Sequence, residues 1–173
     1  MLTLGPRFRG DERVTPFDLF LLQGSKMSVL TLAQASTIVD AALQTGRDSS
    51  FQPLSVAVLD AGGHLVAFKR EDRSGILRFD IAFGKAWGAL GMGLGSRTLF
   101  ERAEKTPMFF TTLAAASGGR VVTNPGGVLI RNAGGEIIGA VGISGDTSGN
   151  DERCAIVGIE AAGLMADPGG SKK

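Results

Sequence analysis

The chain has 173 residues, of which 43% are hydrophobic and 20% are charged, and its formal net charge is +1. This length suits one domain with a buried core. Because the lysines and arginines are scattered and no basic run alternates with aromatic residues, we expect no nucleic-acid partner. No stretch reaches the roughly 18 apolar residues of a transmembrane helix, so we expect no membrane partner either.

The single cysteine, Cys154, excludes an internal disulfide and favours a reducing compartment, so the sequence predicts a cytoplasmic protein. Residues 1–26 are rich in Arg, Gly and Pro and show no sustained period. The apolar run at residues 17–22 is short and acidic, and no small-residue cleavage site follows it, which argues against a signal peptide. Since Met27 directly precedes the first clean helical pattern, we expect a flexible or artefactual extension over residues 1–26 and a single domain over residues 27–166.

The first half of this domain predicts a helix, a hairpin and a second helix. Apolar residues recur at three- and four-residue spacings over residues 31–45, which indicates a helix. Residues 54–60 and 64–70 read as two strands around the turn at residues 61–63, and this pattern is typical of a hairpin. A helical pattern returns over residues 77–94, where glycines interrupt it. A glycine inside a helix costs about 1 kcal/mol relative to alanine, so we expect close approach of another backbone, which includes a subunit contact.

The second half predicts further helices and a second hairpin. In chain order they are helices over residues 97–105 and 107–116, a short strand at Val121-Val122, strands over residues 128–131 and 136–144, and a helix over residues 149–166. Residues 167–173 have the composition of a disordered tail. Because hairpin connections dominate, the sheet should be mostly antiparallel, with helices packed on it.

His64 is the only histidine in the chain, and this limits the available chemistry. A zinc or iron site that needs two or three histidines cannot form within one subunit. Any imidazole-based acid–base step must use His64, which makes it the one candidate catalytic residue. Its position directly after a tight turn is equally typical of an exposed, inert histidine.

Four short segments stand out together, in one order along the chain. They are Val58–Val66 (VLDAGGHLV), Asp80–Ala86 (DIAFGKA), Pro125–Val128 (PGGV), and Val141–Gly145 (VGISG) with Asp151-Glu152 downstream. Over roughly residues 27–166 the chain thereby resembles the GlcG/HbpS family, which includes the C-terminal domain of PduO-type corrinoid adenosyltransferases. The resemblance implies an α/β (α+β) fold with profilin-like α-β-α layers, in which helices cover both faces of a five-stranded antiparallel sheet. It also implies self-association, in homodimers that assemble further, and binding of haem or a corrinoid-related group.

With the resemblance in place, eight residues become candidates for cofactor binding. They are His64, Asp80, Lys85, Pro125, Gly126, Gly127, Asp151 and Glu152. His64 would be the axial ligand of a haem iron or an acid–base group, and Asp80 or Lys85 could meet a propionate or another carboxylate. The backbone N–H groups of residues 125–127 could approach an anion, although these glycines also suit a plain turn. Asp151 and Glu152 equally suit the first turn of the last helix, where negative charge is favourable.

Three functions stay open at this point. The first is a small-molecule or cofactor-binding protein that acts as an oligomer, with haem or a related tetrapyrrole as ligand and a corrinoid, or no cofactor, as alternatives. The second is an enzyme acting on a small organic acid or aldehyde, which needs a pocket that joins His64 with Lys85 or Asp151. The third is a ligand-free assembly partner, which the glycine-lined helix favours.

Overall fold

The computed structural model describes residues 29–170, so the extension predicted over residues 1–26 and the end of the predicted tail lie outside the described residues. Within that range the chain forms a mixed α/β fold. In chain order the elements are α2 (Leu32–Asp48), β1 (Ser55–Asp60), β2 (Leu65–Arg70), α3 (Arg78–Met92), α4 (Ser96–Lys105), α5 (Pro107–Ala116), β3 (Gly127–Arg131), β4 (Ile137–Ser144), α6 (Ser148–Ala161) and β5 (Met165–Asp167).

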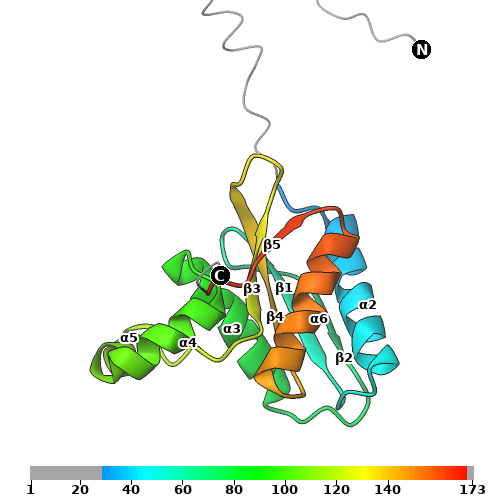
Figure 1. The fold of residues 1–173 in the computed structure, drawn as a ribbon. Helices are drawn as coiled ribbons and strands as arrows, with labels where there is room; N and C mark the ends of the chain where they lie inside the picture. The colour runs from blue at the N-terminus through cyan, green and yellow to red at the C-terminus, as the bar shows by residue number, and fades with distance from the viewer. Residues whose placement is uncertain (1–28, 171–173) are drawn as a thin grey trace, which may run out of the picture.

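The strands form one antiparallel five-stranded sheet in the order β2-β1-β4-β3-β5 (Figure 1). The two predicted hairpins are β1–β2 and β3–β4, and they lie side by side because β1 pairs with β4. This pairing runs from Ser55 opposite Ser144 at one end to Asp60 opposite Gly139 at the other. Both hairpin turns follow the Asp60 end, so the sheet has a turn end and an opposite end, where residues 125–127 enter β3.

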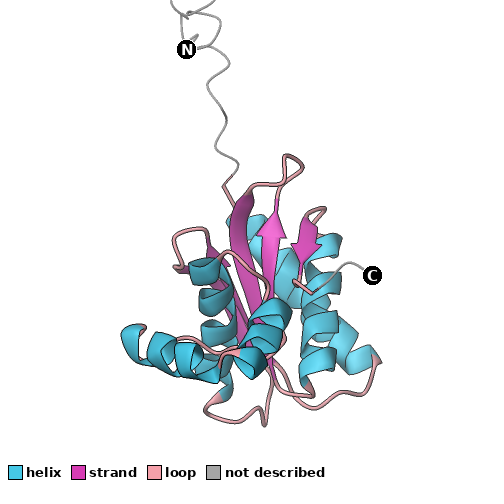
Figure 2. Cartoon of the chain, turned by 60° about the vertical axis from the view of Figure 1, so that its left-hand side comes forward, coloured by secondary structure: helices cyan, strands magenta, loops and turns pink. Residues whose placement is uncertain are grey.

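Helices cover both faces of the sheet (Figures 1 and 2). Helices α2 and α6 pack on one face and α3 packs on the other. Successive residues of β1 serve opposite faces, since Val56 and Val58 join the α2–α6 core whereas Ala57 and Leu59 face α3. The layered arrangement implied by the family resemblance is therefore confirmed.

Helix α3 lies unusually close to the sheet because small residues line the contact. A Cβ atom on Gly142 of β4 would overlap the carbonyl oxygen of Ala82, and one on Gly127 would overlap the carbonyl oxygen of Lys85. On another side of α3, a Cβ atom on Gly84 would lie 2.6 Å from the carbonyl oxygen of Arg120. The close backbone approach expected from the helical glycines thus occurs within the subunit.

Two sequence-based assignments were wrong. Val121 and Val122 form no strand, and the amide of Val122 instead donates to the carbonyl of Gly84, 3.2 Å away. The last helix ends at Ala161 instead of residue 166, and residues 165–167 form β5, which pairs with β3 at the sheet edge. Asp167, assigned by composition to the tail, is part of this strand and its carboxylate lies 2.9 Å from the Arg131 guanidinium.

In residues 29–170 no helix is long and apolar enough to cross a membrane.

The contact between α3 and β4 generates a stability prediction. We expect Gly142→Ala to lower the free energy of unfolding by about 3 kcal/mol, because the added methyl group must push α3 away from the sheet. Gly149→Ala is the matched control, since a Cβ atom there meets no atom within 4 Å and alanine favours helix over glycine. Urea unfolding of both variants checks the difference. A Gly142→Ala protein as stable as the Gly149→Ala protein would show that the contact is not tight.

Cys154 generates a second prediction. Its side chain is fully buried, and burial raises the pKa of the thiol from 9.0 to about 11. We expect it to resist a thiol reagent such as dithionitrobenzoate at pH 8 and to react promptly once the protein is denatured. Because the folded pKa is raised, the thiol's contribution to stability is complete below pH 9.0 and declines as the pH rises toward about 11. Cys154→Ala should remove that decline, and equal reactivity of the native and denatured protein would contradict the prediction.

Candidate functional site

The structure divides the predicted site residues between the two ends of the sheet. Lys85, Asp151 and residues 125–127 meet at the opposite end, whereas His64 lies in the turn of the β1–β2 hairpin. At about 3.4 Å per residue, β1 alone separates these ends by about 17 Å. One subunit therefore does not join His64 with Lys85 or Asp151, which the single-pocket enzyme hypothesis required.

A buried ion pair occupies the opposite end of the sheet. The side chains of Lys85 and Asp151 are only 3% and 2% exposed, and Lys85 Nζ lies 2.8 Å from Asp151 Oδ2. The same ammonium donates to the carbonyl oxygen of Ile143, also at 2.8 Å, and Asp151 Oδ1 accepts from the amide of Asp146. Burial lowers the pKa of Lys85 and raises the pKa of Asp151, and each partner opposes the effect of burial on the other.

The Pro125-Gly126-Gly127 turn closes over this pair. Gly126 has a φ of +115°, which favours glycine, and a Cβ atom there would lie 2.9 Å from Lys85 Nζ. The amide of Gly127 already donates to Ser96 Oγ at 2.7 Å. That N–H is therefore engaged within the protein, and the turn packs against the ion pair.

The other two predicted carboxylates lie outside this contact. Glu152 accepts three hydrogen bonds from Arg97, at 2.9 and 3.1 Å from Nε and at 2.7 Å from Nη2, and this link ties α6 to α4. These hydrogen bonds raise the pKa of Arg97 above its ordinary value. Asp80 lies exposed in the first turn of α3. Neither residue meets His64.

A cavity of about 300 Å³ borders the buried ion pair, with Ile81 and Val122 as its apolar part, and its other walls were not predicted from the sequence. Arg78, Asn124, Ser144 and Ser148 line it together with Lys85. The guanidinium of Arg78 donates to Ser144 Oγ at 3.1 Å. One signal could have pointed to Arg78, since it precedes Lys85 by about two helical turns and so shares a face of α3 with it.

At the turn end, an aspartate orients the single histidine. His64 Nδ1 lies 3.2 Å from Asp60 Oδ1, which also accepts from the amides of Gly62 and His64. Burial alone would raise the pKa of Asp60, but these hydrogen bonds and the proximity of His64 outweigh it and lower the pKa. The His64 side chain is 81% exposed, so its other ring nitrogen is open to a ligand.

An aromatic ring with a cation above it lies beside the same turn. Gly63 has a φ of +80°, and a Cβ atom there would lie 3.2 Å from the ring of Trp87 in α3. The guanidinium of Arg120 lies over that ring, 5.0 Å from its centroid. Trp87 thus packs against the His64 turn, and Arg120 places a positive charge over the Trp87 ring.

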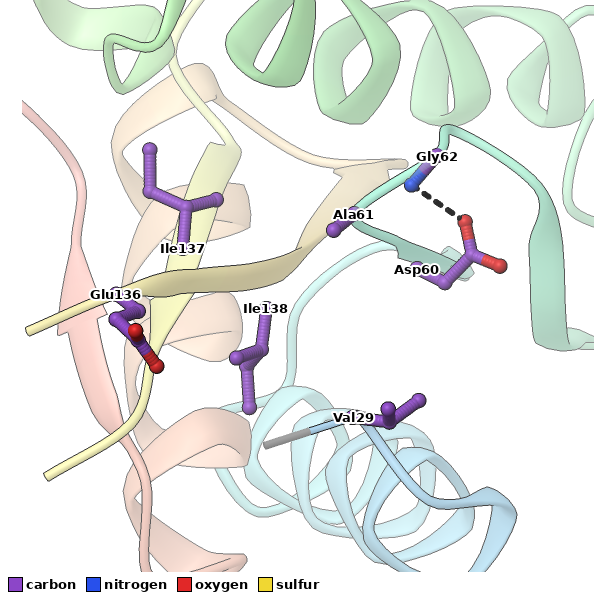
Figure 3. Close-up of a pocket in the computed structure, with 7 residues that line it drawn as sticks. All are labelled: Val29, Asp60, Ala61, Gly62, Glu136, Ile137 and Ile138. Carbon is purple, nitrogen blue, oxygen red and sulfur yellow. Dashed lines mark hydrogen bonds between the residues drawn. The ribbon is translucent and has the colours of Figure 1, made fainter. Parts of the chain in front are cut away.

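A groove of about 390 Å³ separates the two hairpin turns (Figure 3). Asp60, Ala61 and Gly62 line it from the first hairpin, and Ile137 and Ile138 line it from the second, where their side chains point to opposite faces of β4. Across residues 29–170, no three His, Cys, Asp or Glu side chains gather as a metal site. The turn end therefore offers two features for ligand binding, which are the exposed imidazole of His64 and the groove beside it.

The buried ion pair generates a stability prediction that separates structural from ligand-binding roles. We expect Lys85→Met to lower the free energy of unfolding by about 3–5 kcal/mol, because Asp151 is left as an unpaired buried charge. The double variant Lys85→Met with Asp151→Leu should recover most of this loss, and urea unfolding measures both. A single variant that costs less than about 1 kcal/mol would show that the pair is not part of the folding core.

Known proteins share this fold, and two of them are 26% identical to this chain over the matched residues. A curated relative, an uncharacterized 15.0 kDa protein from the dhaT-dhaS intergenic region of Citrobacter freundii, is 26% identical over 139 residues, which are 80% of this chain and 95% of the relative. The crystal structure of a PduOC:heme complex is 26% identical with a TM-score of 0.71, and the match covers 79% of this chain and 96% of the other. The Klebsiella pneumoniae protein ORFY, at 24% identity and a TM-score of 0.70, shares the fold over 81% of this chain and 95% of its own.

The family comparison agrees with these individual matches. The family model described as haem degrading protein HbpS-like matches residues 30–160, which span both hairpins, the buried ion pair and the His64 turn. The resemblance proposed from four short segments is thereby confirmed, and the chain belongs to the HbpS-like family.

Proposed function

We propose that this protein binds haem or a related tetrapyrrole at the turn end of its sheet, with His64 as the axial ligand, and that it does so as an oligomer. The observation that carries the proposal is the Asp60–His64 pair, which presents an exposed imidazole beside an apolar groove. Family membership and the haem complex of a structural relative support the same ligand class.

The Asp60–His64 contact has the form that metal-binding histidines use. A ligating histidine usually donates its second ring N–H to a carboxylate, which fixes the tautomer and the ring orientation. With Nδ1 directed at Asp60, the lone pair of His64 Nε2 is left for a metal. A bound haem would supply iron-centred redox or oxygen chemistry, while the protein provides the axial nitrogen and its orientation.

The surroundings of His64 also suit the rest of a tetrapyrrole. Ile137 and Trp87 are both partly buried on the α3 face of the sheet and offer apolar contact to a flat macrocycle, and Trp87 lies directly against the turn. Arg120, held over Trp87, would pair with a propionate carboxylate. These residues therefore provide the apolar, aromatic and cationic contacts that suit a haem.

The proposal of an oligomer rests on the exposure of His64 and of several large apolar side chains. His64 is largely exposed, and a macrocycle resting on it needs a second wall that the described residues of one subunit do not provide. Ile76, Leu77 and Met108 are 86%, 65% and 79% exposed, and helix α5 packs mainly on α4. A second copy would cover such apolar residues. Because Leu77 adjoins Arg78 at the Ser144 end of the sheet, the wall at His64 would come from a different contact of the same oligomer. A cytoplasmic location, predicted from the one unpaired cysteine, belongs to the same proposal.

Helix α5 also supports one other candidate function. Met108 and Phe109 stand on a largely apolar helix that few residues of its own subunit cover, as expected of an assembly surface. In that case the protein would assemble without any cofactor. An enzyme that uses His64 with Lys85 or Asp151 would need to form its active site between subunits.

Haem titration of untagged protein tests the proposal, because without an affinity tag His64 is the only imidazole in the sample. We expect a saturable Soret band that is lost or strongly shifted in His64→Ala. Asp60→Asn should weaken haem binding about 10- to 100-fold, because the imidazole loses its orienting carboxylate. Asp72→Asn is the matched control, since Asp72 is exposed and follows β2 at the end of the hairpin opposite the His64 turn.

Two outcomes would contradict the proposal. An unchanged Soret band in His64→Ala would exclude His64 as the ligand, and a protein that oligomerises but binds no haem would favour the assembly function. Titration with hydroxocobalamin under the same conditions tests for a corrinoid ligand. A saturable spectral change with hydroxocobalamin and none with haem would identify the corrinoid as the ligand.

A further inference from the structure

We propose that the cavity beside the Lys85–Asp151 pair is a second binding site, and that its ligand is a small monocarboxylate. The cavity lies at the end of the sheet opposite His64, so this inference goes beyond haem binding and does not depend on it. Four features of the cavity carry it: its size, the state of Arg78, the hydrogen bonds of Lys85 and the charge balance.

The size fits a small organic molecule. The cavity measures about 300 Å³, which is at the lower end of the range for small-molecule sites. Its floor is the nearly fully buried ion pair, and Asn124, Ser144 and Ser148 add polar groups around its walls. Convergent polar groups around a small cavity are typical of a binding site that fixes the orientation of its ligand.

Arg78 is the group that would bind the carboxylate. It is half-buried, and its only hydrogen bond to another described side chain is the one to Ser144 Oγ. Among residues 29–170 it forms no ion pair. A guanidinium has five N–H donors in a planar fork that matches the two oxygens of a carboxylate. Arg78 therefore brings a guanidinium with free donors, and without an ion-pair partner among the described residues, to the cavity wall.

Lys85 contributes a donor from the floor. Its ammonium has three N–H groups, of which one binds Asp151 and another binds the carbonyl of Ile143. Since Asp151 balances its charge, Lys85 would act as a hydrogen-bond donor and not as a second net charge. A ligand oxygen next to the carboxylate, such as a keto oxygen, could accept this third N–H.

The remaining charges favour a single negative charge on the ligand. Asp146 also lines the cavity, and its oxygens already accept from the amides of Gln52 and Thr147 and from Asn150, which lowers its pKa and keeps it ionised. Its charge opposes a dianion. The N-terminus of α6, which begins at Ser148, adds a partial positive charge. One free guanidinium, one anchored carboxylate and a helix dipole together suit a monoanion better than sulfate.

Titration of the full chain, labelled with nitrogen-15, by pyruvate, acetate and sulfate tests this inference by NMR. Pyruvate should shift the amide signals of Asn124, Ser144 and Ser148 saturably, and it should bind about fivefold more tightly than acetate because its keto oxygen accepts from Lys85. Arg78→Gln should weaken pyruvate binding at least about tenfold, and Arg78→Lys should restore only part of the affinity, because it keeps the charge without the fork.

Two controls isolate the site. Arg153→Gln removes the same charge from an exposed position of α6 and should leave pyruvate affinity unchanged. His64→Ala should bind pyruvate normally, and Arg78→Gln should bind haem normally, so the failure of one site is distinguishable from the failure of the other. If Arg78→Gln does not give the dispersed spectrum of a folded protein, the three titrations of the wild-type chain still decide.

Three results would overturn the inference. They are the absence of saturable shifts with both carboxylates, equal pyruvate affinity in the wild type and a folded Arg78→Gln protein, and sulfate binding as tight as that of pyruvate. The first excludes the site, the second excludes Arg78 as the receptor, and the third excludes a carboxylate-specific ligand.

Discussion

The ion pair between Lys85 and Asp151 holds the two helical layers together. Lys85 belongs to α3 on one face of the sheet, whereas Asp151 belongs to the first turn of α6 on the other. The pair meets beside Ile143 near the end of β4, and Gly126 leaves the space in which it forms. Removing two charges from water is costly, and the surrounding hydrogen bonds are what make the arrangement stable. The three layers are thereby joined at this end, where the Arg97–Glu152 pair also links α6 to α4.

This junction explains why the site residues separate into two groups. The segments around Lys85, residues 125–127 and Asp151 contact one another. Their residue types are therefore explained by the close packing at this one place. His64 takes no part in it and is held only by its own turn through Asp60. An exposed imidazole that contributes nothing to the core is free to serve a ligand. The two ends of the sheet can therefore carry separate chemistries, one apolar and aromatic, the other polar and charged.

The sequence was sufficient for elements with a strong local signal. Both hairpins were predicted from an Ala-Gly-Gly turn between apolar runs, and the five helices within residues 29–170 were predicted to within a few residues except for the end of α6. Val121-Val122 was misassigned because its β-branched residues pack on α3 instead of pairing with a strand. The short edge strand β5 was missed because three residues have no detectable period, and only pairing with β3 makes them a strand. The pattern also gave five strands, but only because the wrongly assigned strand at residues 121–122 stood in place of the missed β5.

The candidate site was harder to predict, because sequence gives residue types and not their partners. Lys85 and Asp151 were both named, yet nothing local indicated that they bind each other across 66 positions. Gly126 and Gly127 suggested amides free to bind an anion. The amide of Gly127 instead donates to Ser96, and both glycines lack the Cβ atom that would collide with Lys85. Arg78 was overlooked because it lies just before the recognisable segment. The conspicuous glycines and the buried charges thus mark a place where the chain is tightly packed, whereas the cavity beside them is lined by Arg78, which no sequence motif marked.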